Sequence, residues 1–348
     1  MKCMKRVLIF VIFILSLFSC KKEESVKEIL GAGATFPNPL YVKMFDEYHN
    51  KTNIMVNYQS IGSGGGIKQL MEKTIDFGAT DAFLTDEELK GVENILHIPT
   101  CIGGVVLVYN LSNISEDLRF SGDTLAKIFM GEITNWNDDK IKEENDNIAL
   151  PNIPINVVNR ADSSGTTFIF TDYLTKASKD WADKVGVGKS VNWLAKNAVS
   201  GKGNPGVASL VGQLNGSIGY VEISFAIQNS LKMAHIKNKN GYFIKPTLET
   251  ISLSGNVPIP DDTRVTITDT EALEGYPIVS FTWLIFYKEQ NYNNRIKKQA
   301  VELANLLKWI VKDGQQYCEP LDYSPLPLKA IEKANRIIDS ITFNGQKI

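Results

Sequence analysis

Histidine and cysteine are scarce in this sequence. Its 348 residues include 3 His and 4 Cys. The histidines, at positions 49, 97 and 235, have no nucleophile or metal ligand at a recognised spacing, and the cysteines match no zinc motif. The sequence therefore gives little support to a zinc enzyme or a Ser-His-Asp hydrolase. We expect no metal, no cofactor and no enzymatic activity.

The motifs of nucleotide-binding proteins are missing as well. No Gly-x-x-x-x-Gly-Lys-Ser/Thr run occurs, so the chain has no P-loop. The glycine run at 62–66 has Ile67 in the place of the last glycine of the dinucleotide fingerprint. Ile61 likewise stands where a Gly-x-Ser-x-Gly elbow would have its first glycine.

An excess of positive charge is also absent. Against 37 Lys and Arg residues stand 39 Asp and Glu residues, for a formal net charge of −2. A mildly acidic chain is a poor nucleic-acid binder, and we expect no nucleic-acid partner. Any anion that the protein binds must be held by local geometry rather than by its overall charge.

The N-terminal segment has the pattern of an export signal. Three basic residues, Lys2, Lys5 and Arg6, precede an uncharged run from Val7 to Ser19. A helix of 13 residues spans only about 20 Å, too short for a comfortable membrane crossing. This pattern is typical of a signal-peptide apolar region, so we predict that residues 1–19 are removed on export.

The end of that segment predicts lipidation. The run Leu17-Phe18-Ser19-Cys20 resembles a bacterial lipobox, which implies cleavage before Cys20 and acylation of that cysteine. We therefore expect a lipoprotein signal peptide at 1–19 and a lipidated tether at 20–28. The mature protein would be extracytoplasmic and attached to a bacterial membrane, in the periplasm or at the cell surface. A plain signal peptide followed by an incidental cysteine is the alternative.

Two cysteines remain in the mature chain, Cys101 and Cys318. An oxidising compartment would allow them to pair, but their positions in the sequence do not establish the required proximity. We expect two buried thiols rather than a disulfide.

The mature chain alternates strand-like and helix-like segments. Its length suggests two domains, and the alternation predicts an α/β protein with mostly parallel sheets. A capped helix start is expected at 85–89, and loops with an excursion at 237–270. Later strands are expected at Val105–Tyr109, Ile155–Asn159, Ile218–Val221 and Ile278–Tyr287.

The segment from Val157 to Thr167 looks suited to an anion. An apolar strand is followed by Arg160, a Ser-Gly-Thr turn and a helix. Free N–H groups and the positive end of the dipole make a helix start favourable for an anion, and a guanidinium can bind two of its oxygens. An ordinary strand-to-helix turn, with Arg160 solvated or paired to Asp162, is the alternative.

Three further strand-to-helix junctions carry small or hydroxyl residues. They lie at 35–36, 61–66 and 79–81. In open α/β sheets, ligands bind beyond the carboxyl ends of the strands, where such junctions meet. Glycine lets the backbone approach a ligand closely, and hydroxyl groups can donate hydrogen bonds to oxygen. These hydroxyls belong to Thr35, Ser63, Ser164 and Thr166.

Seven segments resemble the PstS family of phosphate-binding proteins, the extracytoplasmic receptors of phosphate-specific ABC transporters. They are Ile29–Tyr41, Tyr58–Gly66, Asp76–Ala82, Ile102–Val108, Gly131–Asp138, Asn159–Thr166 and Ser217–Glu222. The resemblance implies a two-lobe periplasmic binding-protein clamshell (type II-like), each lobe a mostly parallel sheet flanked by helices.

That resemblance also implies domain limits. Residues 29–101 together with 276–348 would form lobe I, and residues 102–275 would form lobe II. The chain would cross between the lobes near 100–103 and again near 274–277. Lobe I would then be completed by the C-terminal segment.

The family's ligand positions carry over onto this sequence residue by residue. The phosphate-binding residues implied are Thr35, Phe36 (through its backbone N–H), Ser63, Asp81, Arg160, Ser164, Gly165 and Thr166. Asp162 would hold the Arg160 guanidinium in place without being a phosphate-binding residue itself. For Asp81 an ordinary helix cap is the alternative; the resemblance instead implies an acceptor for the phosphate proton.

The resemblance implies a monomer that captures inorganic phosphate and delivers it to the permease of an ABC transporter. It would be attached to the membrane through Cys20. Three alternatives remain: a receptor for another protonated tetrahedral oxyanion such as arsenate, a surface phosphatase or esterase, and a surface lipoprotein that binds a partner.

Overall fold

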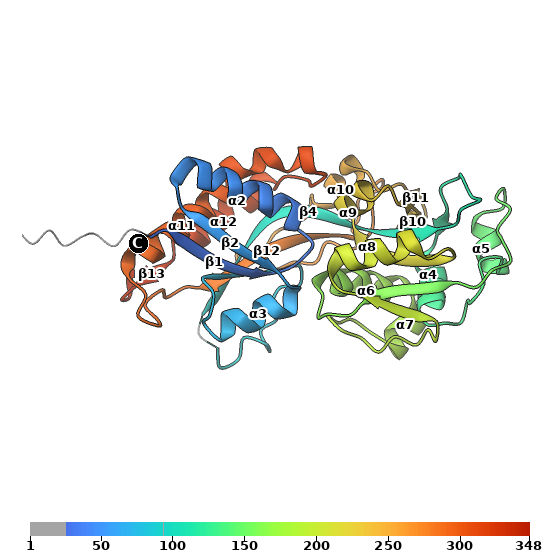
Figure 1. Ribbon diagram of the computed structural model, residues 1–348, viewed down its shortest axis with the longest axis horizontal. Helices are drawn as coiled ribbons and strands as arrows, with labels where there is room; N and C mark the ends of the chain where they lie inside the picture. The colour runs from blue at the N-terminus through green and yellow to red at the C-terminus, as the bar shows by residue number, and fades with distance from the viewer. Residues whose placement is uncertain (1–25, 93) are drawn as a thin grey trace, which may run out of the picture.

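A computed structural model describes residues 26–92 and 94–348 (Figure 1). The predicted signal peptide, Cys20 and most of the predicted tether lie outside the described residues. Within those ranges, no helix is long and apolar enough to cross a membrane. The described chain forms two lobes, joined by long strands that run from one to the other (Figure 1).

Lobe I is built on three parallel-paired strands. Strand β1 lies between β2 and β3 and pairs in parallel with both. Helices from both ends of the described chain cover this sheet (Figure 1). The strands are β1 (Glu28–Gly33), β2 (Met55–Ser60) and β3 (Phe77–Thr80). The helices are α2 (Asn38–Thr52), α3 (Ser63–Met71), α11 (Lys297–Val311) and α12 (Leu328–Ile338).

Lobe II repeats this arrangement. Strand β6 pairs in parallel with β7 and β8. The strands are β6 (Asn156–Arg160), β7 (Ala198–Gly201) and β8 (Ser217–Glu222). The helices are α4 (Gly122–Phe129), α5 (Asp139–Glu144), α6 (Gly165–Ala177), α7 (Lys179–Lys184), α8 (Gly203–Gln213) and α9 (Ile223–Gln228).

Two long strands belong to the junction of the lobes. Strand β4 (Ile95–Asn110) pairs with β12 (Val279–Tyr287) up to Gly104, and with β8 from Val105 onward. The full strand order is β2-β1-β3-β12-β4-β8-β6-β7. The outer pairs are parallel, as the sequence predicts, whereas β4 and β12 are antiparallel to each other because they cross between the lobes in opposite directions.

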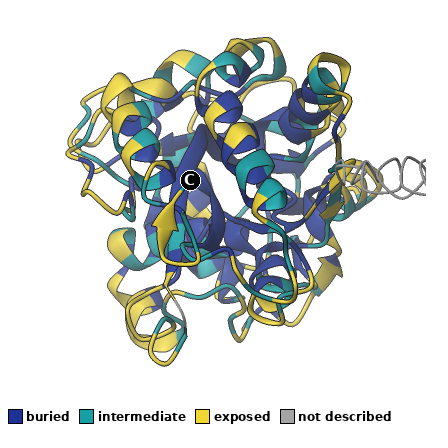
Figure 2. Ribbon diagram, turned by 90° about the vertical axis from the view of Figure 1, so that its left-hand side faces the viewer, coloured by how far each residue is buried: buried dark blue, intermediate teal, exposed yellow. Residues whose placement is uncertain are grey.

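The sheets are enclosed by amphipathic helices. In α2 the buried residues recur at the spacing of one helical face, so one side packs on the sheet and the other faces solvent. Figure 2 shows the buried strands surrounded by helices with exposed outer faces. The buried residues of α2 are Leu40, Tyr41, Met44, Phe45 and Tyr48.

Cys101 and Cys318 are buried and free, which agrees with the expected thiols.

The helix predicted to start at Thr85 does not form. Its capping contacts are present: the Thr85 N–H donates to Glu88 Oε2 at 2.9 Å, and the Glu88 N–H donates to Thr85 Oγ1 at 3.2 Å. The segment nevertheless remains a series of turns, and Gly91 has φ +76°. A cap satisfies the first N–H groups but does not extend a helix, which needs a continuing apolar face.

The segment 237–270 is mostly irregular, as predicted, but it contains regular pieces. Strand β11 (Phe243–Ile244) pairs with β10 (His235–Lys237), which pairs with β5 (Arg119–Phe120). Helix α10 (Leu248–Ser254) follows. Strand β9 (Lys232–Met233) pairs with β4.

Near the C-terminus lie two short 3₁₀ helices and a hairpin: η1 (Asp313–Tyr317), η2 (Glu319–Leu321), β13 (Thr342–Phe343) and β14 (Gln346–Lys347).

Candidate anion-binding site

The four strand-to-helix junctions singled out in the sequence meet between the two lobes. Lobe I contributes the junction from β1 to α2, the start of α3 and the end of β3. Lobe II contributes the end of β6 and the start of α6. The predicted residues at these junctions are almost completely buried: Thr35 (5% exposed), Phe36 (0%), Ser63 (0%), Asp81 (1%), Arg160 (6%), Ser164 (0%) and Thr166 (0%).

Direct contacts join the two halves of this cluster. The Gly165 N–H of α6 donates to Ser63 Oγ of α3 at 3.1 Å, and the Gly64 N–H donates to the Ser163 carbonyl at 3.0 Å. Gly165 also lies against Asp81: a Cβ on Gly165 would be 2.6 Å from Asp81 Oδ2. Only glycine fits there, so the two lobes are in contact in a closed arrangement.

Helix starts from both lobes surround the cluster. Ser63 is the first residue of α3, Gly165 of α6 and Gly203 of α8. The Ser164 hydroxyl caps α6 by accepting from the Thr167 N–H at 3.1 Å. Gly62, before α3, has φ +97°, a conformation that favours glycine. Three helix dipoles therefore present their positive ends to one small volume.

Arg160 is held by Asp162 in a two-pronged ion pair. Arg160 Nε donates to Asp162 Oδ1 at 2.9 Å and Nη2 donates to Oδ2 at 2.6 Å. Nη1 donates to Thr166 Oγ1 at 3.2 Å. Burial acts to raise the pKa of Asp162, but the hydrogen bonds and charge of Arg160 hold that pKa below its ordinary value. Asp162 therefore stays ionised and fixes the guanidinium plane.

Asp81 has the opposite electrostatic environment. Burial raises its pKa to about 7, although the Thr282 hydroxyl, the charge of Arg160 and the Ser63 hydroxyl all act to lower it. Thr282 Oγ1 donates to Asp81 Oδ1 at 2.7 Å, and Ser63 Oγ lies 3.5 Å from Oδ2. The carboxyl group can therefore exchange a proton near neutral pH, which suits an acceptor for a ligand's acidic proton.

Sequence reasoning missed two members of this cluster, Asn204 and Thr282. Asn204 is fully buried, and its Nδ2 donates to Thr35 Oγ1 at 2.9 Å and to Thr166 Oγ1 at 3.1 Å. A signal was available, because Asn204 lies in a glycine-rich strand-to-helix junction, 201–206, similar in kind to 62–66. Thr282 gave no such signal, since it lies within the mostly apolar strand β12.

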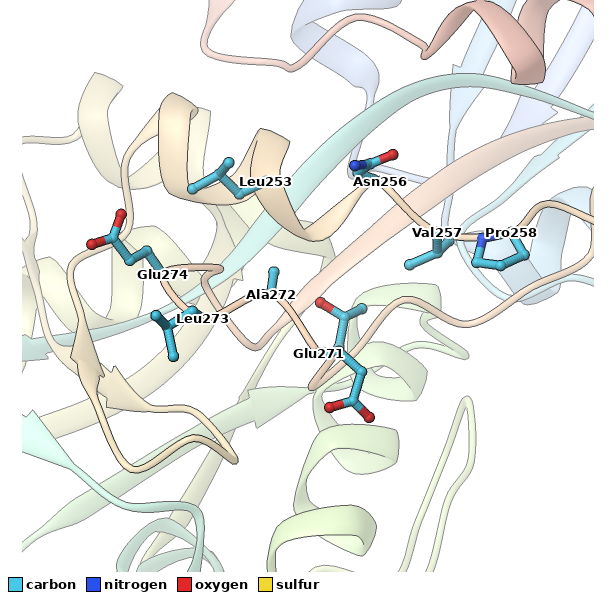
Figure 3. A pocket seen from close by; sticks show the side chains of 9 residues that line it. Leu253, Asn256, Val257, Pro258, Glu271, Ala272, Leu273 and Glu274 are labelled. Atoms are coloured by element: carbon cyan, nitrogen blue, oxygen red, sulfur yellow. The ribbon is translucent and has the colours of Figure 1, made fainter.

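A separate hollow lies beside α10 and contains no predicted site residue (Figure 3). Its lining combines apolar side chains with two carboxylates, Glu271 and Glu274, and includes no lysine or arginine. That lining is unsuited to an anion. Elsewhere among residues 26–92 and 94–348, no three His, Cys, Asp or Glu residues are grouped so that they could hold a metal ion.

Residues 21–313 match the model of a PBP superfamily domain. The phosphate-binding protein PstS of Xylella fastidiosa (strain 9a5c) is 40% identical over 319 residues, which cover 90% of this chain and 85% of that protein. PstS of Pasteurella multocida (strain Pm70) is 41% identical over 309 residues, covering 88% of each. PstS of Methanocaldococcus jannaschii is 38% identical, covering 83% of this chain and 79% of that protein.

Solved structures support the same architecture. A high affinity periplasmic phosphate-binding protein, PfluDING, solved with bound phosphate, superimposes with a TM-score of 0.73 at 23% identity, covering 89% of this chain and 93% of that one. A phosphate-binding protein from Stenotrophomonas maltophilia gives a TM-score of 0.67 at 19% identity, covering 89% and 93%. These likenesses establish the two-lobe α/β fold expected from the sequence.

Proposed function

This chain belongs to the PBP superfamily and, within it, to the PstS family, and from that premise we propose that it captures inorganic phosphate between its lobes. It then delivers the phosphate to the permease of a phosphate ABC transporter. The observation that carries this proposal is that buried hydrogen-bond donors from both lobes meet around one carboxyl group, that of Asp81, whose pKa is raised. The choice of phosphate as the ligand follows from the relatives, which are named phosphate-binding proteins. The donors and the arginine of the cluster suit such an anion.

The proposed ligand groups hold phosphate through many hydrogen bonds and one arginine. The hydroxyls of Thr35, Ser63, Ser164 and Thr166, with the N–H groups of Phe36 and Gly165, are the hydrogen-bond donors. Arg160 supplies the full positive charge, and Asp162 fixes its plane. In the structure the Gly165 N–H donates to Ser63 Oγ at 3.1 Å, so on binding it would exchange that partner for a phosphate oxygen. Donors on residues that the fold already holds in place lose little freedom on binding, which favours tight capture.

Asp81 provides selectivity in this proposal. Phosphate near neutral pH carries at least one proton, which an ionised Asp81 accepts in a hydrogen bond. Sulfate carries none, so its oxygen would face a second acceptor. An unpaired acceptor in a buried site costs about 1–3 kcal/mol, and more when it is charged. Arsenate has the same proton pattern as phosphate and should bind as well.

Closure couples binding to transport. A ligand that touches Ser63 and Asp81 in lobe I and Arg160 in lobe II interacts more strongly with the closed arrangement than with an open one, and so shifts the population toward it. The permease then distinguishes the loaded protein by its closed shape. In this proposal the protein is a monomer, attached through acylated Cys20 on the outer side of a bacterial membrane.

A ligand screen on the mature chain tests the proposal. Phosphate and arsenate should raise the melting temperature, since a ligand at 100 times its dissociation constant stabilises a protein by about 2.7 kcal/mol. Sulfate and molybdate at equal concentration should have little effect. A phosphate titration without heat or thermal shift would reject the proposal, and equal stabilisation by sulfate would reject the role given to Asp81.

A further inference from the structure

Asn204 uses every polar atom of its side chain within the proposed site. It is the second residue of α8 and is fully buried. Its Oδ1 accepts from the Glu222 N–H at 2.9 Å. Its Nδ2 donates to Thr35 Oγ1 at 2.9 Å and to Thr166 Oγ1 at 3.1 Å. One amide group therefore connects a hydroxyl of lobe I with a hydroxyl of lobe II.

The orientation of this amide is determined by the backbone. The Glu222 N–H can only donate, so the atom that faces it must be the amide oxygen. Both hydrogens on Nδ2 are then directed at the two threonines. A flipped amide would place two donors against each other at Glu222 and an acceptor against the threonines.

As a consequence, the hydroxyls of Thr35 and Thr166 can act toward any further group only as hydrogen-bond donors. A hydroxyl has two acceptor lone pairs and one proton. Thr35 Oγ1 accepts from the Asn204 N–H at 3.1 Å as well as from Nδ2. Thr166 Oγ1 accepts from Arg160 Nη1 at 3.2 Å as well as from Nδ2. Both acceptor sites of each oxygen are occupied, and each proton remains to be donated elsewhere.

We propose that Asn204 is a positioning residue that makes Thr35 and Thr166 obligate hydrogen-bond donors toward the bound oxyanion. This inference rests on the phosphate function proposed above and deepens it. The two ligand oxygens that accept from these hydroxyls are favoured in the unprotonated form, because an ionised oxygen is the stronger acceptor, so the phosphate proton is favoured on the oxygen that faces Asp81. Asn204 thereby fixes the orientation of the protonated ligand without needing to contact it.

Substitutions at Asn204 separate this role from simple packing. Asn204→Asp keeps the shape and the acceptor for the Glu222 N–H, but it removes both side-chain donors and adds an acceptor that competes for the threonine protons. We expect its phosphate affinity, measured by isothermal titration, to fall about 100-fold or more, and that of Asn204→Ala about 10-fold. Thermal unfolding of each ligand-free variant shows whether it is folded.

A double-mutant cycle provides a measurement that a packing defect would not change. In the Thr35→Val, Thr166→Val background the hydroxyls that Asn204 directs are gone, so Asn204→Ala should change phosphate affinity less than about twofold. The matched control is Asn145→Ala, which removes another buried amide of lobe II, one that bonds the Arg119 backbone away from the site. It should lower the melting temperature and leave affinity unchanged.

Two results would overturn the inference while leaving the proposed function standing. One is wild-type phosphate affinity in a folded Asn204→Ala protein. The other is a loss of affinity that is the same in the wild-type and double-valine backgrounds. If the wild-type chain itself bound no phosphate, the proposed function would fall first, so the two failures are distinguishable.

Discussion

At the scale of single residues, a buried and a partly buried carboxyl group near one arginine have opposite roles. Asp162 has a lowered pKa because Arg160 binds it with two hydrogen bonds that outweigh its burial. Asp81 has a pKa raised to about 7 because burial dominates and Arg160 acts on it only through its charge. The same guanidinium thus keeps one carboxylate ionised as its support and leaves the other able to exchange a proton.

We predict that Asp81→Asn weakens phosphate binding and improves the relative binding of sulfate. An amide no longer accepts the phosphate proton as strongly, and it presents an N–H to the sulfate oxygen that an ionised Asp81 repels. Competition titrations should show the phosphate-to-sulfate affinity ratio falling by about 10-fold or more. An unchanged ratio would place the source of selectivity elsewhere in the site.

In the closed arrangement, the burial of Asp81 should make stability depend on pH. Its pKa is about 7 when folded against 3.8 when unfolded, so the folded state holds the proton longer. The free energy of unfolding of the closed arrangement should therefore fall as pH rises from about 4 to about 7, by on the order of 4 kcal/mol from this group. Asp81→Asn should lack this component, and its stability advantage over wild type should grow across that interval. Denaturant unfolding at several pH values measures it, and parallel curves for the two proteins would contradict it.

At the scale of secondary structure, the site depends on how helix starts are placed at strand ends. Each of β2, β6 and β7 leads within a few residues into a helix whose first turn enters the cluster. The start of α6 is the most constrained, since Gly165 contacts Ser63 and Asp81 of the other lobe. The fit of α6 against lobe I is therefore a property of the closed arrangement alone.

We predict that Gly165→Ala folds normally but closes poorly. Its Cβ would lie 2.5 Å from Ser63 Oγ and 2.6 Å from Asp81 Oδ2, too close for the lobes to meet. Phosphate affinity should fall by about 100-fold or more, while the ligand-free melting temperature should change little, because the clash exists only between closed lobes. Scattering with phosphate should show less compaction than for wild type.

The matched control for that variant is Gly212→Ala in α8. There the nearest atom to a new Cβ is Leu231 Cδ2 at 3.5 Å, an ordinary contact. Alanine also favours a helix more than glycine does. This variant should keep wild-type affinity, and a similar loss in both variants would show that the effect of Gly165→Ala is not specific to the closed interface.

The residues at the strand ends were more predictable from the sequence than the contacts that these residues make with one another. Hydroxyl and glycine residues after apolar strands predicted where Ser63, Asp81 and Arg160 would gather, because parallel strands bring their carboxyl ends together. The glycine-rich junction 201–206 was a signal for Asn204, but its hydrogen bond with the Glu222 N–H depends on tertiary contacts that the sequence pattern does not encode. Thr282 was missed because it lies in a mostly apolar strand, and the register shift beside it, between Thr282 and Trp283, cannot be read from that pattern.

At the scale of the whole molecule, an ion pair joins the two lobes in addition to the contacts of the proposed site. Lys189 of lobe II pairs with Glu88 of lobe I at 2.6 Å. Both partners continue into site loops: the Lys189 carbonyl accepts from the Ser164 N–H at 2.8 Å, and Glu88 holds the turn at Thr85. This ion pair exists only when the lobes are together, so it adds to the stability of the closed arrangement.

We predict that Glu88→Gln weakens phosphate binding by about two- to fivefold at low salt, because a partly exposed pair is worth about 0–1 kcal/mol. The difference from wild type should shrink as salt is added. Glu132→Gln is the control, since Glu132 pairs with Lys184 within lobe II at 2.8 Å. Equal salt dependence of affinity in both variants would exclude an interlobe contribution from Glu88.

The antiparallel crossing of β4 and β12 restricts how the molecule can open. Two strands hydrogen-bonded side by side form a ribbon, and a ribbon bends readily across its face but resists shear and in-plane bending because those motions break its ladder of hydrogen bonds. Motions of the lobes that shear this ladder are therefore disfavoured relative to bending. We therefore expect opening to proceed mainly by bending where β4 passes from the lobe I sheet to that of lobe II, a motion whose reversal brings the start of α6 back toward Asp81.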